Sequence, residues 1–181
     1  MARQRGPRWR MRCLPLLREA AELGSPDATY ALGTWYLFGV VVQRNARKGA
    51  NLFKRAADRG HASAQYDLAV CYELGKGRKR NDREARRWYE ESALSGDAQA
   101  KQELARCYVY GIGGKADRRQ ALFWYRKAAL SGNSEAQYEL AVAYETGDGA
   151  RRNQRAARIW YERAAAQGDQ DAREALRRLR R

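Results

Sequence analysis

The chain has 181 residues, of which 44% are hydrophobic and 31% are charged, and its formal net charge at pH 7 is +15. No apolar run approaches the roughly 20 residues of a membrane-spanning helix, so we expect no membrane span. A basic excess usually indicates nucleic acid or an anionic membrane as a partner. A GC-rich coding sequence would also enrich Arg, Ala and Gly, so the charge by itself does not indicate a function.

The first part of the chain differs from the rest. Residues 1–9 form a basic leader, and residues 10–24 have the pattern of half a repeat, with one helix from about Met11 to Leu23. The apolar run from Cys13 to Leu17 is shorter than the h-region of about 7–15 residues in a secretory signal. An Arg-rich start without acidic residues is also found in organellar transit peptides. We expect a cytoplasmic protein, with a transit peptide as the alternative.

Glycines recur along the chain at a constant spacing of 36 residues, at positions 24, 60, 96, 132 and 168. A fixed period of this length indicates a repeat protein, in which each unit packs only against its neighbours. The period divides the chain into four full units and a C-terminal capping helix, which are residues 25–60, 61–96, 97–132, 133–168 and 169–181. We expect these parts and the half repeat to form one all-α solenoid domain.

Each full unit begins with the apolar periodicity of a helix. In the last full unit Ala136, Leu140, Ala141 and Tyr144 fall on one stripe of an α-helix. Equivalent residues recur in the other units. A glycine suited to a helix C-cap then follows, at positions 39, 75, 111 and 147.

A second helix is predicted after a short loop in each unit. The loop ends in a good N-cap residue, which is Asn45, Asn81, Asp117 or Asn153. In the third unit, the second-helix stripe consists of Ala121, Trp124, Ala128 and Ala129. Small alanines let two backbones approach, and the aromatic residues fill the remaining volume. The pattern predicts antiparallel helix pairs.

The order Ala…Leu-Ala/Gly…Tyr-x-x-Gly-x-Gly…Asn/Asp…Ala-x-x-Trp-Tyr-x-x-Ala-Ala-x-x-Gly resembles the Sel-one-like repeat, a 36-residue relative of the tetratricopeptide repeat. The resemblance covers about residues 12–180. It implies a right-handed α/α superhelical solenoid of antiparallel helix pairs, with the first helices on the concave side. It also implies an adaptor that holds other proteins together.

The first unit departs from this pattern in its loop. Val41 stands where the later units have Gly77, Gly113 and Gly149, so we expect the first loop to differ. The apolar residue that the repeat pattern has at the next position is kept only as Val42, and Arg78, Gly114 and Ala150 replace it in the later units.

Residues with catalytic or metal-binding chemistry are scarce. The single histidine, His61, lies at a unit junction, where we expect it to be solvated, and no G-x-S-x-G motif is present. The Gly-x-Gly pairs follow predicted helices and lack the rest of a phosphate-binding motif. Cys13, Cys71 and Cys107 lack zinc or disulfide spacing and are expected to be buried, unreactive thiols. We expect no enzyme, no cofactor and no metal.

Candidate partner-binding residues come from the concave positions of tetratricopeptide repeats, counted from the Leu-Ala/Gly pair of each first helix. They are Tyr30, Thr34, Leu37, Phe38, Tyr66, Val70, Glu73, Leu74, Gln102, Arg106, Val109, Tyr110, Tyr138, Val142 and Glu145. Aromatic and aliphatic side chains here indicate a groove for a peptide or helix of a partner protein. The second interpretation is that some of these side chains pack against the neighbouring first helix.

Charge divides unevenly between the two kinds of helix. The first helices are net acidic and the second helices are net basic. The groove is therefore expected to prefer a basic or amphipathic protein segment. The alternative function is nucleic-acid binding by the basic convex face and loops, with Lys76, Arg78, Lys79 and Arg80 as anionic-partner contacts, unless that run is only a solvated loop.

Apolar residues cover nearly all of the predicted first helix of the chain, where Leu16 and Ala20 are expected to be exposed unless Trp9 and Met11 cover them. We therefore predict self-association or partner docking at this end.

Overall fold

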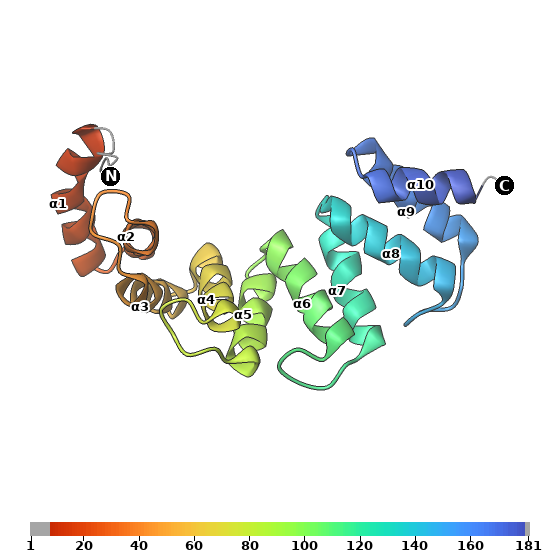
Figure 1. The fold of residues 1–181 in the computed structure, drawn as a ribbon, viewed down its shortest axis with the longest axis horizontal. Helices are drawn as coiled ribbons and strands as arrows, with labels where there is room; N and C mark the ends of the chain where they lie inside the picture. Colours follow the sequence, from red (N-terminus) through yellow and green to blue (C-terminus); the bar gives the residue numbers. More distant parts are fainter. Residues whose placement is uncertain (1–7, 180–181) are drawn as a thin grey trace. The chain divides into compact units, whose positions relative to one another are not determined.

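The computed structural model describes residues 8–179, and their side chains from Arg12 onward. All regular structure in this range is helical, as predicted (Figure 1). The helices are α1 (Arg8–Glu22), α2 (Pro26–Phe38), α3 (Ala46–Ala57), α4 (Ala62–Leu74), α5 (Asp82–Leu94), α6 (Ala98–Tyr110), α7 (Arg118–Leu130), α8 (Ser134–Thr146), α9 (Gln154–Ala166) and α10 (Gln170–Arg178). The side chains of Trp9 and Met11 lie outside the described residues, as does most of the basic leader.

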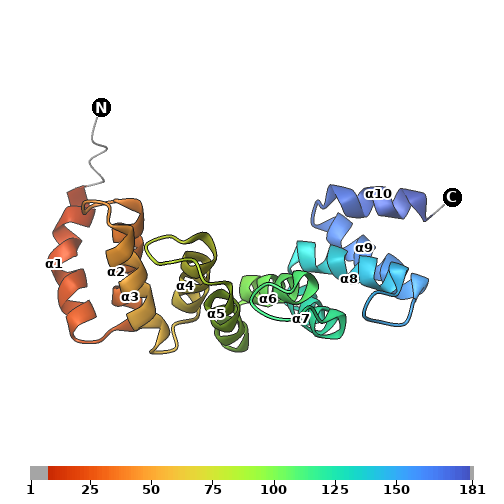
Figure 2. The same cartoon turned by 60° about the horizontal axis from the view of Figure 1, so that its bottom comes forward.

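The chain forms two compact units, and each is described by itself. Unit 1 extends from Met1 to Ser95 and unit 2 from Gly96 to Arg181. In unit 1, α1 packs against α2, α2 against α3, α3 against α4 and α4 against α5, and α1 to α3 stand side by side (Figure 2). In unit 2 the same succession of packed neighbours extends from α6 to α10. This arrangement of helix pairs, each joined to the next pair, is the predicted α/α solenoid.

The helix ends are held by the predicted caps. Asn45, for example, accepts a hydrogen bond from the Lys48 amide at 2.9 Å, and Asn153 accepts one from the Ala156 amide at 3.0 Å. Gly39 ends α2 in the left-handed conformation, with φ of 73°. These interactions satisfy backbone groups that the helix itself leaves unpaired. The helix boundaries therefore follow from local sequence.

His61 corrects one prediction. Its ring Nδ1 accepts a hydrogen bond from the Ala64 amide at 3.1 Å and caps α4. Its Nε2 lies 3.2 Å from a carboxylate oxygen of Asp27, and its ring stacks on Tyr30 with centroids 4.6 Å apart. The side chain is only 15% exposed, so it is a packed capping residue and not a solvated one.

The core of each repeat is a seam between its two helices. Leu68, Leu104 and Leu140 of the first helices are fully buried, as are most alanines of the second helices. Cys71 and Cys107 are buried as expected, and burial raises the pKa of the Cys71 thiol to about 11. Cys13 is exposed, which corrects the expectation that all three thiols are buried.

The first loop differs from the later ones, as predicted. Gly77, Gly113 and Gly149 have φ between 72° and 76°. No other residue type in the described range has a positive φ, so Val41 follows another path.

Candidate partner-binding surfaces

The tyrosines of the first helices lie against the second helix of their own repeat. Tyr66 contacts Tyr89 and Tyr138 contacts Tyr161, each with ring centroids 5.7 Å apart. Tyr30 contacts Phe53 at 5.6 Å in the same way. All three tyrosines are half-buried. They support the fold of their own repeat, whereas the second interpretation of the sequence placed some of the groove residues against the neighbouring first helix.

Two glutamates among the predicted groove residues bind the core tyrosines. The Tyr89 hydroxyl donates to Glu73 at 2.6 Å, and the Tyr161 hydroxyl donates to Glu145 at 2.6 Å. Arg178 of α10 donates to both oxygens of Glu145, at 2.7 and 2.8 Å. Burial and the bond to Glu145 raise the pKa of Tyr161. A large part of the hydrogen-bonding capacity of Glu145 is therefore used inside unit 2.

The third repeat lacks this hydrogen bond. Val109 occupies the position of Glu73 and Glu145, and the Tyr125 hydroxyl has no hydrogen-bond partner among the described residues. A cavity of about 70 Å³ lies between α6, α7 and α8, with Glu139 and Tyr125 in its lining. Burial raises the pKa of Glu139, and the nearby Glu135 raises it further. The sequence analysis missed Glu139, although an acidic residue recurs at this position as Asp67 and Glu103.

Three predicted groove residues remain prominent on the surface. Phe38, Leu74 and Tyr110 are the last residues of α2, α4 and α6, and they are 65%, 59% and 72% exposed. The core uses none of these three side chains. Exposed aromatic and aliphatic groups of this size are suited to binding a partner.

The other predicted groove residues are less available. Thr34 donates to the Tyr30 carbonyl at 3.2 Å, and Arg106 pairs with Glu103 at 2.6 Å. Gln102 is buried and accepts a hydrogen bond from Asn133 at 3.2 Å. Leu37, Val70, Val109 and Val142 are half-buried. The structure thus separates exposed helix ends from positions that mainly hold the repeats together.

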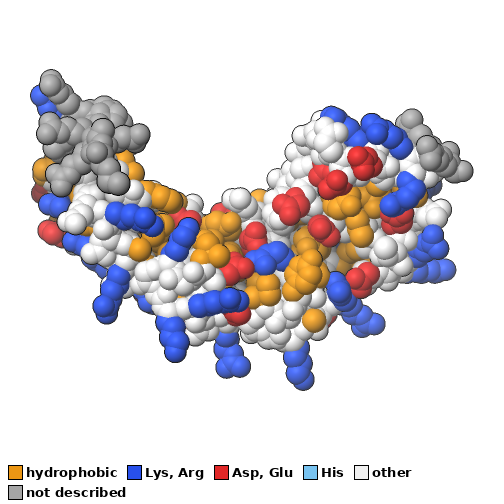
Figure 3. Space-filling view, viewed as in Figure 1, with side chains coloured by type: hydrophobic (Ala, Val, Ile, Leu, Met, Phe, Trp, Pro, Cys, Tyr) orange, Lys and Arg blue, Asp and Glu red, His pale blue; other side chains and the backbone are white. Residues whose placement is uncertain are grey.

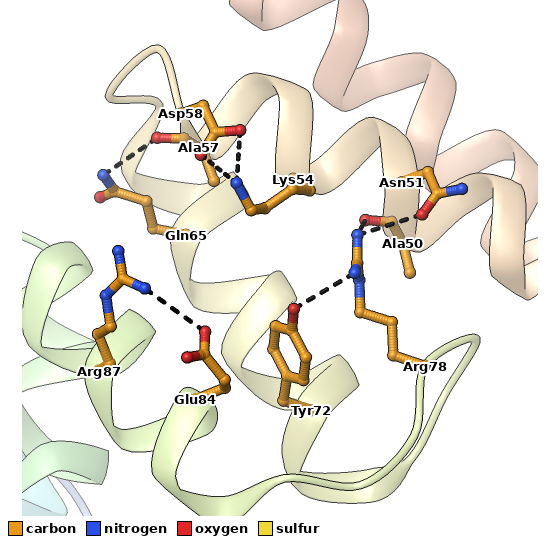
Figure 4. A network of polar contacts seen from close by, with 10 residues as sticks. All are labelled: Ala50, Asn51, Lys54, Ala57, Asp58, Gln65, Tyr72, Arg78, Glu84 and Arg87. Carbon is orange, nitrogen blue, oxygen red and sulfur yellow. Dashed lines mark hydrogen bonds and ion pairs between the residues drawn. The ribbon is translucent and has the colours of Figure 1, made fainter.

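The basic loop between α4 and α5, residues 75–81, is partly held by contacts within unit 1. Arg78 donates to the Ala50 carbonyl at 3.3 Å, to Asn51 at 3.2 Å and to the Tyr72 hydroxyl at 3.3 Å (Figure 4). Its Nε is buried without a hydrogen-bond partner. Arg80 pairs with Asp82 at 2.9 Å. Arg78 is therefore a link between this loop and α3.

An open hollow of about 860 Å³ lies beside this loop. Its lining includes Arg47, Arg78, Lys79 and Arg80 and contains no carboxylate. Lys76 and Lys79 are exposed. In unit 1, Lys and Arg side chains extend from the lower edge of Figure 3. Of the four predicted anionic-partner contacts, the two lysines and Arg80 lie at the surface.

Two leucines, one within α1 and one just after it, are accessible. Leu16 is 67% exposed and Leu23 is 83% exposed. Ala20 is half-buried, so the expected exposure is confirmed for Leu16 and is only partial for Ala20. Self-association through this helix stays a prediction.

The hydrogen bond between Tyr161 and Glu145 can be tested by one substitution. We expect Tyr161→Phe to lower the free energy of unfolding by about 1 kcal/mol, because a partly buried carboxylate loses a donor while Arg178 remains. Tyr125→Phe is the matched control and should change stability by less than about 0.5 kcal/mol. Urea denaturation measures both variants. Equal losses would show that the hydroxyl of Tyr161 is not what stabilises unit 2.

Two structural features distinguish membrane proteins and metalloproteins from other classes. Within residues 8–179, no helix is long and apolar enough to cross a membrane. The same part of the chain has no group of three or more His, Cys, Asp or Glu residues placed to hold a metal ion.

Comparisons with known proteins agree on the repeat. A model of the Sel1 repeat family matches residues 26–61, 62–97, 98–133 and 134–169. These matches begin one residue after the units expected from the glycine spacing. A search of curated proteins found no match.

Solved structures with the same fold include two bacterial proteins at about 30% identity. A Sel1 repeat protein from Oxalobacter formigenes is 31% identical with a TM-score of 0.88, and the match covers 92% of this chain and 68% of that one. A protective antigen of uropathogenic Escherichia coli with an SLR fold is 30% identical with a TM-score of 0.89. That match covers 92% of this chain but only 36% of the antigen.

A third structure resembles the chain in fold alone. The Helicobacter pylori cysteine rich protein B is 20% identical with a TM-score of 0.59, and the match covers 76% of this chain and 99% of that protein.

Proposed function

Because the chain belongs to the Sel1 repeat family, whose members are generally protein-interaction scaffolds, we propose that it binds a protein partner on the face of its first helices. Family members are typically not enzymes, and we propose a non-enzymatic scaffold here as well. The observation that carries the proposal is the exposure of Phe38, Leu74 and Tyr110 at the ends of first helices.

The partner segment is proposed to be basic or amphipathic. In unit 2, Asp and Glu side chains gather over the part where α8 and α10 lie (Figure 3). Apolar groups at the helix ends supply contact area, and carboxylates favour a basic partner by electrostatic complementarity. A peptide or a helix of another protein has both kinds of group. The cytoplasmic location stays a prediction.

Nucleic-acid binding by unit 1 is the second candidate. A second open hollow, of about 530 Å³, includes Arg18, Arg44 and Lys48 in its lining and again has no carboxylate. The hydrogen bond from Lys48 lowers the pKa of Tyr36 in this hollow, and Arg18 lowers it further. Two carboxylate-free basic hollows in one unit favour a polyanion, such as a phosphate backbone.

One capture experiment tests the scaffold proposal. The tagged chain is incubated with a lysate of its source organism, with and without nuclease. We expect proteins that remain bound after nuclease treatment. Capture by the Phe38→Ala/Leu74→Ala variant should be about thirtyfold weaker or more, because hot-spot side chains each contribute about 1 to 2 kcal/mol. Leu94→Ala is the matched control, since Leu94 is 69% exposed but ends a second helix.

The outcomes separate the two candidates. Equal capture by Phe38→Ala/Leu74→Ala and by the unchanged chain would contradict use of the first-helix face. Capture that disappears with nuclease and weakens steeply with salt would favour the basic hollows of unit 1.

A further inference from the structure

The cavity between α6, α7 and α8 has a structural origin in the repeat. Repeat 1 places Leu37 at the position of Val109, and repeats 2 and 4 place Glu73 and Glu145 there. These side chains are all larger than valine. In repeat 3 the shorter side chain leaves about 70 Å³ open beside Tyr125. We call this cavity the α7–α8 pocket, and its lining includes Val109, Leu122, Tyr125, Glu139 and Val142.

Negative charge at this pocket is not balanced by a paired cation. Glu139 is half-buried in the pocket wall and has no ion pair among the residues that the structure describes. Glu135, one turn earlier on α8, also has none within that range. Arg118 and Asp148 also line the pocket, and they pair with each other at 3.3 Å. Two carboxylates on α8 are thus left without a counter-ion.

The polar groups that face Glu139 from the packed helices strengthen this imbalance. Burial is the main cause of the raised pKa of Glu139, and repulsion by Glu135 adds to it. Burial also raises the pKa of Tyr125, as do the nearby Glu139 and Tyr110. The Tyr125 phenol therefore stays neutral at physiological pH, with an oxygen that can accept a hydrogen bond. A partly buried carboxylate without a counter-ion has lost part of its hydration, and a cation in the pocket would offset that cost.

We propose that the α7–α8 pocket receives the ammonium group of a lysine side chain from the protein partner, with Glu139 as its counter-ion. This inference rests on the scaffold function proposed above and names the chemistry of one contact. A water molecule occupies about 30 Å³ in the liquid, so the pocket has room for about two. An ammonium and its neighbouring methylene suit this space, whereas the planar guanidinium of arginine needs a wider fork of acceptors.

Each wall of the pocket has a part in this contact. The Glu139 carboxylate accepts a charge-assisted hydrogen bond from the ammonium, and the Tyr125 oxygen accepts a second one. Val109, Leu122 and Val142 surround the methylenes of the lysine. Binding of the cation favours the ionised form of Glu139 and therefore lowers its pKa.

The test uses the 181-residue chain and two small probes, so no partner has to be known. N-acetyl-lysine N-methylamide is the ligand, and N-acetyl-norleucine N-methylamide is its uncharged analogue. Saturable shifts in the NMR signals of Leu122, Tyr125 and Val142 are expected with the lysine probe alone. The probe should also lower the pKa of Glu139, followed through its ¹³C-labelled carboxyl group.

Three variants separate the pocket from a general acidic surface. Glu139→Gln keeps the shape and removes the charge, and should weaken the lysine probe at least about tenfold. Val109→Leu introduces the residue that repeat 1 has at this position and should weaken it by a similar factor. Glu135→Gln is the matched control, because Glu135 is exposed on the same helix, and should change the affinity less than about threefold.

The pH dependence has a defined direction. The folded-state pKa of Glu139 lies above the ordinary value of 4.5. The affinity for the lysine probe should therefore rise with pH through a midpoint above 4.5 and then level off. This rise should persist in Glu135→Gln and disappear in Glu139→Gln.

Several results would overturn the pocket assignment. They are equal binding of the norleucine probe, unchanged affinity in Glu139→Gln, or tighter binding of the corresponding arginine probe. Such a failure would leave the scaffold proposal standing, because that proposal depends on protein capture through Phe38 and Leu74. Conversely, lysine-probe binding without any captured protein would support the pocket and contradict the scaffold.

Discussion

Replacing Gly77 by alanine is expected to lower the free energy of unfolding by about 3 kcal/mol or more. Gly77 has a φ of 72°, a conformation that side chains with a Cβ rarely adopt. A Cβ atom at this position would also overlap the backbone carbonyl of Ala46, at the start of α3. The backbone strain and the overlap add to each other. The loop can relieve the overlap only by moving away from α3. Urea denaturation followed by circular dichroism measures the loss.

Gly60 is the matched control for this substitution. Its φ of 80° is similar, but no atom lies within 4 Å of an added Cβ. Gly60→Ala should therefore cost only the backbone strain, about 1 kcal/mol. Equal losses at the two glycines would show that the loop of repeat 2 is not held against α3. The close approach also explains the glycine at this loop position of repeat 2, and an added Cβ at Gly149 would meet the backbone of Arg118 in the same way.

Replacing Leu140 by alanine is expected to cost about 3 kcal/mol, because Leu140 is fully buried in the seam of repeat 4. In a solenoid, each repeat is stabilised mainly by its nearest neighbours. The damage should therefore be local. Amide hydrogen exchange should lose protection in α7 to α10, while α2 and α3 keep theirs.

Leu130→Ala is the control for this prediction. Leu130 is 64% exposed at the end of α7, so its loss should change stability by less than about 0.5 kcal/mol. Uniform loss of protection along the Leu140→Ala chain would contradict the nearest-neighbour picture. It would indicate instead that the whole solenoid unfolds in one cooperative step.

The proposed function depends on which side chains the fold leaves free. Glu73 and Glu145 are carboxylates among the predicted groove residues and would attract cations. Both, however, accept hydrogen bonds from core tyrosines. Phe38 and Leu74 have no such task and remain exposed. Glu139 lines a pocket and, like Glu135, has no ion pair among the described residues. Partner binding is therefore expected to concentrate at the helix ends of unit 1 and at the α7–α8 pocket of unit 2.

The repeat, the helices and their boundaries could be predicted from the sequence because their causes are local. Asn45 caps the helix that starts one residue later, and Gly39 ends the helix immediately before it. The apolar stripe that includes Leu140 lies within a single helix. Such signals act over a few residues and recur with every repeat. A spacing of 36 residues and these caps are enough to determine an all-α solenoid.

The roles of individual half-exposed residues were decided only by the tertiary structure. Tyr66 packs on Tyr89 of the next helix, and Glu145 binds both Tyr161 and Arg178 on two other helices. The α7–α8 pocket likewise depends on a valine in α6 facing a tyrosine in α7 and a glutamate in α8. Periodicity places a residue on a face of its helix. The atoms that face this residue depend on how the neighbouring helices pack. Helix packing therefore decides whether a side chain is bound within the fold or remains available to a partner.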